Sequence, residues 1–213
     1  MRVFSVFFHP DPTISAVGGA EKRFIETSKI LTKKRFRMTV LEPKPSLLSK
    51  SGISCEIHEL SNFVRTSKNG WIDIYFEWIT WIFRACIKCL FLIRKRKYDL
   101  ILATNNTAPN LITAYFAHFV SRLPLCVVVH HVDVLSPDVN SSLISVYRIY
   151  RTVGFTRLVS SLKSIAFFVI IALLKRADTC IAVSNSTAKA LMKLGLQKNR
   201  ICISGNGVNT DYI

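Results

Sequence analysis

Two histidines and an aspartate follow a short apolar run, at a spacing that suits acid–base chemistry. Residues 126–129 read Cys-Val-Val-Val, and His130, His131 and Asp133 come directly after them. Such a run predicts a buried parallel strand, and open α/β sheets bind ligands beyond the carboxyl ends of their strands. A histidine there can act as a base near neutral pH, oriented by the carboxylate. The alternative, that one histidine only caps the strand and bonds a loop carbonyl, is about equally compatible with this stretch.

A glycine pair forms the second candidate site. Gly18 and Gly19 lie between a predicted strand at 2–8 and an amphipathic helix that runs to about Lys33. Glycines at such a junction let a ligand approach the backbone, and the N–H groups of the first helical turn can bind an anion. A plain tight turn explains the glycines at least as often, and Glu21 in the first turn also complements the helix dipole.

Strands and helices alternate along the chain, and this order predicts the fold class. The sequence predicts strands at 2–8, 36–42, 53–60, 98–104, 126–129, 178–183 and 200–203, separated by helical segments that include 71–97, 109–122, 143–176 and 188–194. The alternation implies an α/β fold, a parallel sheet with helices on both faces. Asn105 follows one predicted strand. Ser184 follows another, where it also suits a helix N-cap.

The chain carries a strong excess of positive charge. Its 213 residues give a formal net charge of +16 at pH 7, which points to an anionic partner: a phosphorylated substrate, acidic lipid or nucleic acid. We discount nucleic acid because the sequence holds no recognised nucleic-acid motif and its basic residues neighbour long apolar runs. An anionic membrane surface is the better prediction.

Six cysteines are present, and their pattern is not that of a disulfide framework. Cys126, Cys180 and Cys202 fall inside predicted buried strands, where cysteine behaves as a small apolar residue. Cys86 and Cys89 have metal-like spacing, but they lie in an apolar helical stretch without a second pair, so we interpret them as structural. The N-terminus runs straight into a strand with no secretory signal, which predicts a reducing, cytoplasmic compartment.

Two apolar segments raise the question of a membrane. The longest unbroken apolar run, Ile165–Leu174, has ten residues, against about 20 for a bilayer span, so no spanning helix is predicted. Residues 71–97 are too densely apolar for a helix with one buried stripe, and they end in the basic run Arg94–Lys97. Either this helix packs on the sheet or it lies at the cytosolic face of a membrane as a peripheral anchor.

Three blocks, in order, resemble a known family. The tail combines Ala177–Ser184 with the block 205–209, Gly-Asn-Gly-Val-Asn. The glycine loop 18–21 and the histidine block 130–133 precede it. Together these blocks resemble the N-terminal domain of GT-B glycosyltransferases of glycosyltransferase family 4. The sequence departs from that pattern at Asn209, where the family usually has an aspartate.

The resemblance implies a domain organisation and a substrate. Residues 1–205 would be a Rossmann-like acceptor-side domain, one half of a GT-B fold, and 206–213 the start of an interdomain linker. On this resemblance the C-terminal donor-binding domain would be absent, and the isolated chain is expected to be inactive without a partner domain. The substrates implied are a nucleotide sugar and a lipid-linked or saccharide acceptor. No metal or cofactor is implied. The competing hypothesis is a non-catalytic, membrane-associated binding subunit or a truncated relic.

The resemblance also implies roles for individual residues. His130 would assist transfer and Asp133 would orient it, with His131 as the competing assignment because the histidine is doubled. The implied donor and acceptor cleft residues are Gly18, Gly19, Glu21, Asn105, Ser184, Asn206 and Gly207.

Overall fold

Seven parallel strands form one sheet in the order β3-β2-β1-β4-β5-β6-β7. The computed structural model describes residues 1–9, 17–61, 71–132, 143–152 and 154–205. The strands are β1 Arg2–Val6, β2 Arg37–Lys44, β3 Glu56–Ser61, β4 Leu100–Ala103, β5 Leu125–Val129, β6 Thr179–Ala182 and β7 Ile201–Ile203. The helices are α1 Gly19–Lys33, α2 Trp71–Lys95, α3 Ala108–Ser121, α4 Leu143–Thr152, α5 Arg157–Leu174 and α6 Asn185–Lys193, with 3-10 turns at Ser49–Ser51 and Lys198–Arg200.

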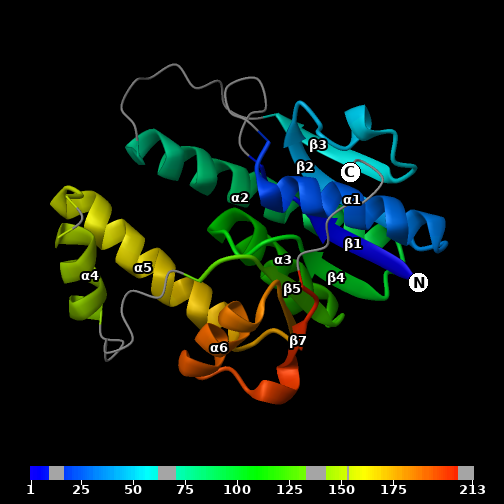
Figure 1. The fold of residues 1–213 in the computed structure, drawn as a ribbon. Helices are drawn as coiled ribbons and strands as arrows, with labels where there is room; N and C mark the ends of the chain where they lie inside the picture. The colour runs from blue at the N-terminus through cyan, green and yellow to red at the C-terminus, as the bar shows by residue number, and fades with distance from the viewer. Residues whose placement is uncertain (10–16, 62–70, 133–142, 153, 206–213) are drawn as a thin grey trace.

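Alternate residues of each strand enter two different cores, because successive side chains of a strand point to opposite faces. In β5, Leu125, Val127 and Val129 join one core, whereas Cys126 joins the other. The first core also contains buried residues of α2, α3, α5 and α6, and the second contains Phe24 of α1. The predicted α/β fold with a Rossmann-like parallel sheet and helices on both faces is therefore confirmed (Figure 1).

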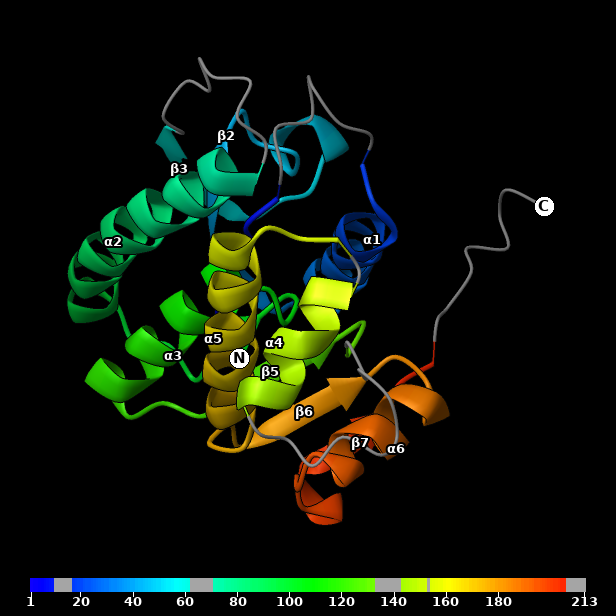
Figure 2. The same cartoon turned by 90° about the vertical axis from the view of Figure 1, so that its left-hand side faces the viewer.

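The long helix α2 is apolar on two opposite sides. Trp81, Ala85, Cys89 and Leu92 face the core at helical spacing. On the other side, large apolar side chains are 42–67% exposed; this exposed stripe consists of Phe76, Ile79, Phe83, Ile87 and Phe91. The core-facing stripe explains why the segment is a helix here. The exposed stripe finds no cover within the described part of the chain. Figure 2 shows α2 with α3 and α5 on this face of the molecule.

The segment 143–176, predicted to be helical, forms two helices, α4 and α5, with a break between them that the sequence pattern did not predict. Gly154 adopts a left-handed φ of 93°, which ends the helical path and which glycine tolerates without steric cost. Thr156 then caps α5, its side chain accepting a hydrogen bond from the Val159 N–H at 3.4 Å. The break lets α4 fold back and pack against α5.

Helix α5 also differs from the expectation that no segment could span a membrane. Within the described residues, this one helix of 18 residues is long and apolar enough to cross a bilayer by length and composition. The unbroken apolar run 165–174 is only ten residues long. The helix is longer because it begins at Arg157 and includes several serines and Lys163 before that run. A helix that packs in a protein core needs the same composition, and Ile171 and Leu174 of α5 lie in the first core.

One of the three strand cysteines is also placed differently from the prediction. Cys126 and Cys180 are buried, but Cys202 is exposed. Cys202 lies on β7, the edge strand of the sheet, and an edge strand is packed by a neighbour on one side only. The sequence pattern of an apolar run does not reveal whether a strand is central or at the edge.

Candidate functional site

The carboxyl ends of β4 and β5 open into a cavity that contains most of the predicted histidine block. His130 is half-buried directly after β5, and His131, one residue further on, is exposed. The cavity has a volume of about 350 Å³. It is lined by Ala20, Glu21, Tyr75, Trp78, Asn105–Ala108, His130–Val132, Tyr150, Lys163, Ala166, Phe167, Ile170, Ile171 and Leu174. Asp133, predicted to orient the histidine, lies outside the described residues.

His130 is held in its neutral form by its surroundings. Desolvation by burial lowers the pKa of His130 below its ordinary value of 6.5, and the positive charge of Arg23 lowers it further. A hydrogen bond with the Thr104 backbone and the charge of Glu21 act in the opposite direction and are weaker. At pH 7 the ring is therefore unprotonated and can accept a proton from a ligand in the cavity.

Asn105 has a structural role in this site. Its side-chain Oδ1 accepts hydrogen bonds from the Thr107 N–H at 2.9 Å, the Thr107 hydroxyl at 2.6 Å and Asn110 Nδ2 at 2.7 Å. These bonds close the turn between β4 and α3. Asn105 lines the cavity, but its carbonyl oxygen is already occupied.

Two further asparagines, which the sequence analysis did not single out, tie the loops of the site together. Asn106 donates a hydrogen bond from Nδ2 to the His131 carbonyl at 2.7 Å, which links the loop after β4 to the loop after β5. Asn110 is fully buried and binds both backbone groups of Phe8: Oδ1 accepts from the N–H at 2.7 Å and Nδ2 donates to the carbonyl at 3.1 Å. Phe8 is 102 residues away in the sequence, so no local pattern signals this contact.

The glycine pair begins α1 as predicted. Gly18 is the N-cap residue, with no side-chain hydrogen bond to the first turn, and Gly19 is the first helical residue. Both are exposed, and Glu21 lines the cavity. The backbone N–H groups of this turn are thus left without a side-chain cap beside the cavity, an arrangement that favours anions.

Arg23, on the second turn of α1, connects this helix to the end of β7. Its guanidinium donates hydrogen bonds to the Gly205 carbonyl at 2.7 Å and the Ser204 hydroxyl at 2.5 Å. Desolvation lowers the pKa of Arg23, and an arginine stays charged at neutral pH even so. The charge also acts on His130. The sequence analysis missed Arg23 because its partners lie more than 180 residues further along the chain.

The remaining predicted residues are placed elsewhere or not described. Ser184 is the N-cap of α6, and its hydroxyl accepts a hydrogen bond from the Thr187 N–H at 3.1 Å. It lies after β6 and does not line the cavity of the histidines. Asn206 and Gly207 lie outside the described residues.

Part of the cavity lining is apolar and aromatic. It is built by Trp78 of α2 and by Phe167 and Ile170 of α5. Lys163, which also lines the cavity, lies over the rings of Phe155 at 4.1 Å and Tyr150 at 5.4 Å, which places a cation at the cavity through cation–π contacts. A ligand of this cavity therefore meets polar groups, an apolar surface and the cation of Lys163.

The described residues contain no cluster of histidines, cysteines and carboxylates that could hold a metal ion. Cys86 and Cys89 lie in α2, and desolvation by burial raises the pKa of the Cys86 thiol to about 11 and raises that of Cys89 as well. Both thiols stay protonated at neutral pH, whereas a metal ligand is a thiolate. The structural interpretation of this pair agrees with their environment.

Solved structures with the same fold include sugar-nucleotide enzymes. Anabaena Alr3699/HepE in complex with UDP and glucose aligns with a TM-score of 0.55 and 21% identity, over 99% of this chain and 46% of that one. Staphylococcus aureus MnaA with UDP aligns with a TM-score of 0.57 and 13% identity, over 96% of this chain and 44% of that one. The UDP-GlcNAc 2-epimerase of Methanocaldococcus jannaschii aligns with a TM-score of 0.57 and 11% identity, over 97% of this chain and 46% of that one. The chain thus spans about half the length of these proteins.

The sequence itself carries a family assignment. A comparison with curated protein sequences found no significant match. The sequence model of Glycosyltransferase Family 4, however, matches residues 17–212, which include the glycine pair, the histidine block and the tail. With the parallel sheet and the cavity at its carboxyl edge, this match identifies the chain as a member of glycosyltransferase family 4.

Proposed function

We propose that this chain is the acceptor-side domain of a glycosyltransferase that moves a sugar from a nucleotide sugar to an acceptor. The observation that carries the proposal is His130, neutral and half-buried in a cavity at the carboxyl edge of the sheet. The family assignment supports sugar transfer. Since the chain spans about half of the similar enzymes, we propose that a second domain supplies most of the donor site.

His130 has a defined task in this reaction. An acceptor hydroxyl that attacks the anomeric carbon loses its proton, while the bond from that carbon to the nucleoside diphosphate breaks. A neutral imidazole within reach can take the proton. The departing diphosphate gains negative charge, and the uncapped first turn of α1 at Gly18 and Gly19, with Arg23 on the next turn, provides positive potential on that side. No metal or cofactor is part of the proposal.

The apolar part of the lining suggests the kind of acceptor. Trp78, Phe167 and Ile170 give the cavity an apolar surface in addition to its polar loops, and a free sugar gains little from such a surface. An acceptor whose sugar or phosphate is joined to an apolar group would use both kinds of surface. We therefore favour a lipid-linked acceptor over a free saccharide, with Lys163 near its polar linkage.

The test is transfer by a reassembled enzyme. The chain is assayed alone and with a family-4 donor-binding domain supplied separately, using a panel of UDP-sugars and release of UDP as the readout. We expect no turnover alone and turnover with the partner domain. His130→Gln is expected to lower kcat by about 100-fold or more, the usual contribution of a general base.

The matched control is His58→Gln. His58 lies on β3, outside the cavity, and its pKa is also lowered by desolvation and by Lys88, so the substitution removes a similar imidazole without touching the site. His131→Gln tests the neighbouring assignment. Wild-type turnover in the His130 variant would remove this residue from the mechanism, and robust turnover by the chain alone would refute the need for a donor domain.

A second candidate function is attachment to an anionic membrane surface, and the exposed stripe of α2 favours it. The stripe runs along the helix from Phe76 to Phe91, and Arg94 and Lys95 follow it, both exposed. An apolar face ending in cations is the pattern of a helix that lies in the headgroup region. All six cysteines are free, which agrees with attachment at the cytosolic face.

Co-sedimentation with vesicles tests the attachment. We expect binding to vesicles that contain phosphatidylglycerol and little binding to neutral ones. Arg94→Gln with Lys95→Gln is expected to remove about 2 kcal/mol, roughly thirtyfold in affinity, at about 1 kcal/mol for each cation near the surface.

Phe83→Ser with Phe91→Ser should also weaken this binding. The matched control changes exposed apolar residues of other helices, Ile30→Ser with Met192→Ser. An equal loss of vesicle binding in the phenylalanine variant and in the control variant would contradict the attachment. Equal binding of the wild-type chain to neutral and acidic vesicles would also contradict it. Vesicle binding together with inactivity of the reassembled enzyme would favour a non-catalytic binding subunit.

A further inference from the structure

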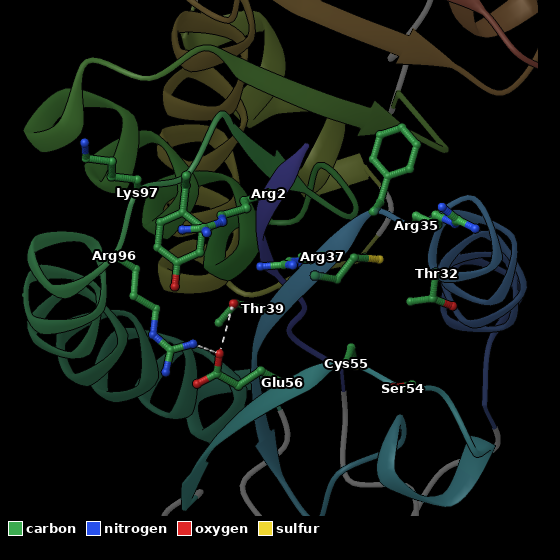
Figure 3. A pocket seen from close by; sticks show the side chains of 13 residues that line it. Arg2, Thr32, Arg35, Arg37, Thr39, Ser54, Cys55, Glu56, Arg96 and Lys97 are labelled. Carbon is green, nitrogen blue, oxygen red and sulfur yellow. Dashed lines mark hydrogen bonds and ion pairs between the residues drawn. The ribbon is translucent and has the colours of Figure 1, made fainter.

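A second cavity lies at the opposite edge of the sheet, at the amino ends of β1 and β2. Its volume of about 710 Å³ exceeds that of the cavity at His130. Figure 3 shows the basic side chains that line it; these are Arg2, Arg35, Arg37, Arg96 and Lys97, against Glu56 as the acidic one. Nothing in the proposed sugar transfer uses this edge, because α/β enzymes bind their substrates at the carboxyl ends of the strands.

Arg2 and Arg37 are brought together by the sheet itself. They are register partners in the parallel pairing of β1 with β2, so their backbones are one strand spacing apart, about 4.8 Å. Both are exposed at the rim, and in the described part of the chain neither guanidinium has an ion pair or hydrogen bond. Like charges in facing positions repel, and an anion bound between them would turn this repulsion into attraction.

One residue that lines this cavity has a buried hydroxyl without a hydrogen-bond partner in the described part of the chain. Tyr98 is 6% exposed and packs its ring on Phe4 at 5.4 Å. Its side chain lines the cavity, and its hydroxyl finds no hydrogen-bond partner in the described part of the chain. Buried hydroxyls are usually paired, so this one has unused hydrogen-bonding capacity beside the basic residues that line the same cavity.

One arginine of the cavity is already oriented. Arg96 forms an ion pair with Glu56, which also accepts a hydrogen bond from the Thr39 hydroxyl at 3.3 Å. The pair neutralises one of the five cations. The other four, Arg2, Arg35, Arg37 and Lys97, keep their charge for a ligand. Guanidinium groups beside hydroxyls are the side chains that bind phosphate with paired hydrogen bonds.

We propose that this basic cavity binds a phosphate-bearing anion, through Arg2, Arg37 and Tyr98. The phosphate comes either from a soluble phosphorylated compound or from a phospholipid headgroup, since α2 with its exposed stripe ends immediately before Arg96. This site is separate from the sugar-transfer site and does not depend on it.

The first arm of the test uses inorganic pyrophosphate. We expect it to bind the wild-type chain in calorimetry and to raise its Tm, because a ligand of the folded state stabilises it. Arg2→Gln with Arg37→Gln should lower the affinity at least tenfold. Without pyrophosphate the double variant should be as stable as the wild type or more so, because the repulsion is relieved. The matched control, Lys189→Gln with Lys193→Gln on α6, removes the same charge from exposed positions far along the chain and should bind normally.

Tyr98→Phe separates binding from folding. It keeps the ring and removes a hydroxyl that stabilises nothing in the described structure, so we expect unchanged or higher Tm and a several-fold loss of pyrophosphate affinity. A hydroxyl with a structural role would give a lower Tm instead. His130→Gln should leave pyrophosphate binding at the basic cavity unchanged.

The second arm uses vesicles of phosphatidylcholine with and without phosphatidylglycerol. Vesicle binding that needs Arg2 and Arg37, without pyrophosphate binding, would assign the site to a lipid headgroup. Pyrophosphate binding that needs them would assign it to a soluble phosphate. The proposal would be overturned if the chain bound neither pyrophosphate nor the vesicles. It would also be overturned if the double arginine variant and the double lysine variant lost the same amount of affinity.

Discussion

Replacing Asn110 should destabilise the domain more than most single changes. The side chain is fully buried and pairs both backbone groups of Phe8, at 2.7 and 3.1 Å. Asn110→Ala leaves the Phe8 N–H and carbonyl without partners, and each unpaired buried group costs about 1–3 kcal/mol. Loss of the bonds to Asn105 and Thr107 adds to this. We expect a loss of about 3–5 kcal/mol, against a total stability of about 5–15 kcal/mol for a domain.

Urea unfolding followed by circular dichroism measures this loss. Asn110→Asp is a sharper variant, since it keeps the shape and the acceptor for the Phe8 N–H. It places an oxygen where Nδ2 now donates to the Phe8 carbonyl and Asn105, so it should cost at least about 3 kcal/mol. Asn106→Ala is the control. It removes one bond, to the His131 carbonyl, and should cost about 1 kcal/mol or less. A loss in Asn110→Ala no larger than in the control would refute the reasoning.

Three further predictions concern other parts of the chain. Cys202 is exposed, whereas Cys126 and Cys180 are buried and their thiols have a raised pKa. Cys202→Ser should therefore remove the fastest phase of labelling by a thiol reagent. An unchanged fast phase would contradict the exposure of Cys202 on β7. Arg35 adopts a left-handed φ of 64° just past α1, and Arg35→Gly should raise the unfolding free energy by about 1 kcal/mol; a lower midpoint in urea would contradict this. The lowered pKa of His130 means that the unfolded chain takes up its proton first as the pH falls below 6.5. Unfolding free energy should therefore decrease from pH 6.5 toward the folded pKa, and His130→Gln should make that decrease smaller; identical slopes would show that His130 is not desolvated.

Features set by a few neighbouring residues were predictable from the sequence. The pair Gly18-Gly19 starts α1, and Ser184 caps α6. In each case the signal is the conformational or hydrogen-bonding preference of one residue beside an apolar period. The position of His130 at the edge of the sheet followed in the same way from the run before it.

Features set by distant residues were not predictable. Arg23 binds Ser204 and Gly205, and Asn110 binds Phe8. Each contact joins a helix to a loop more than 100 residues away in the sequence, so no local pattern contains it. The break before Thr156 was missed because an apolar helical period continues on both sides of it. The exposure of Cys202 depends on strand order, which the local pattern of an apolar run does not contain.

Helix α2 joins the two cavities. Tyr75 and Trp78, near its first residues, line the cavity of His130, and Arg96, just past its last residue, lines the basic cavity. Its 25 residues make a rod of about 37 Å. A displacement of this rod along its axis would change the shape of both cavities together.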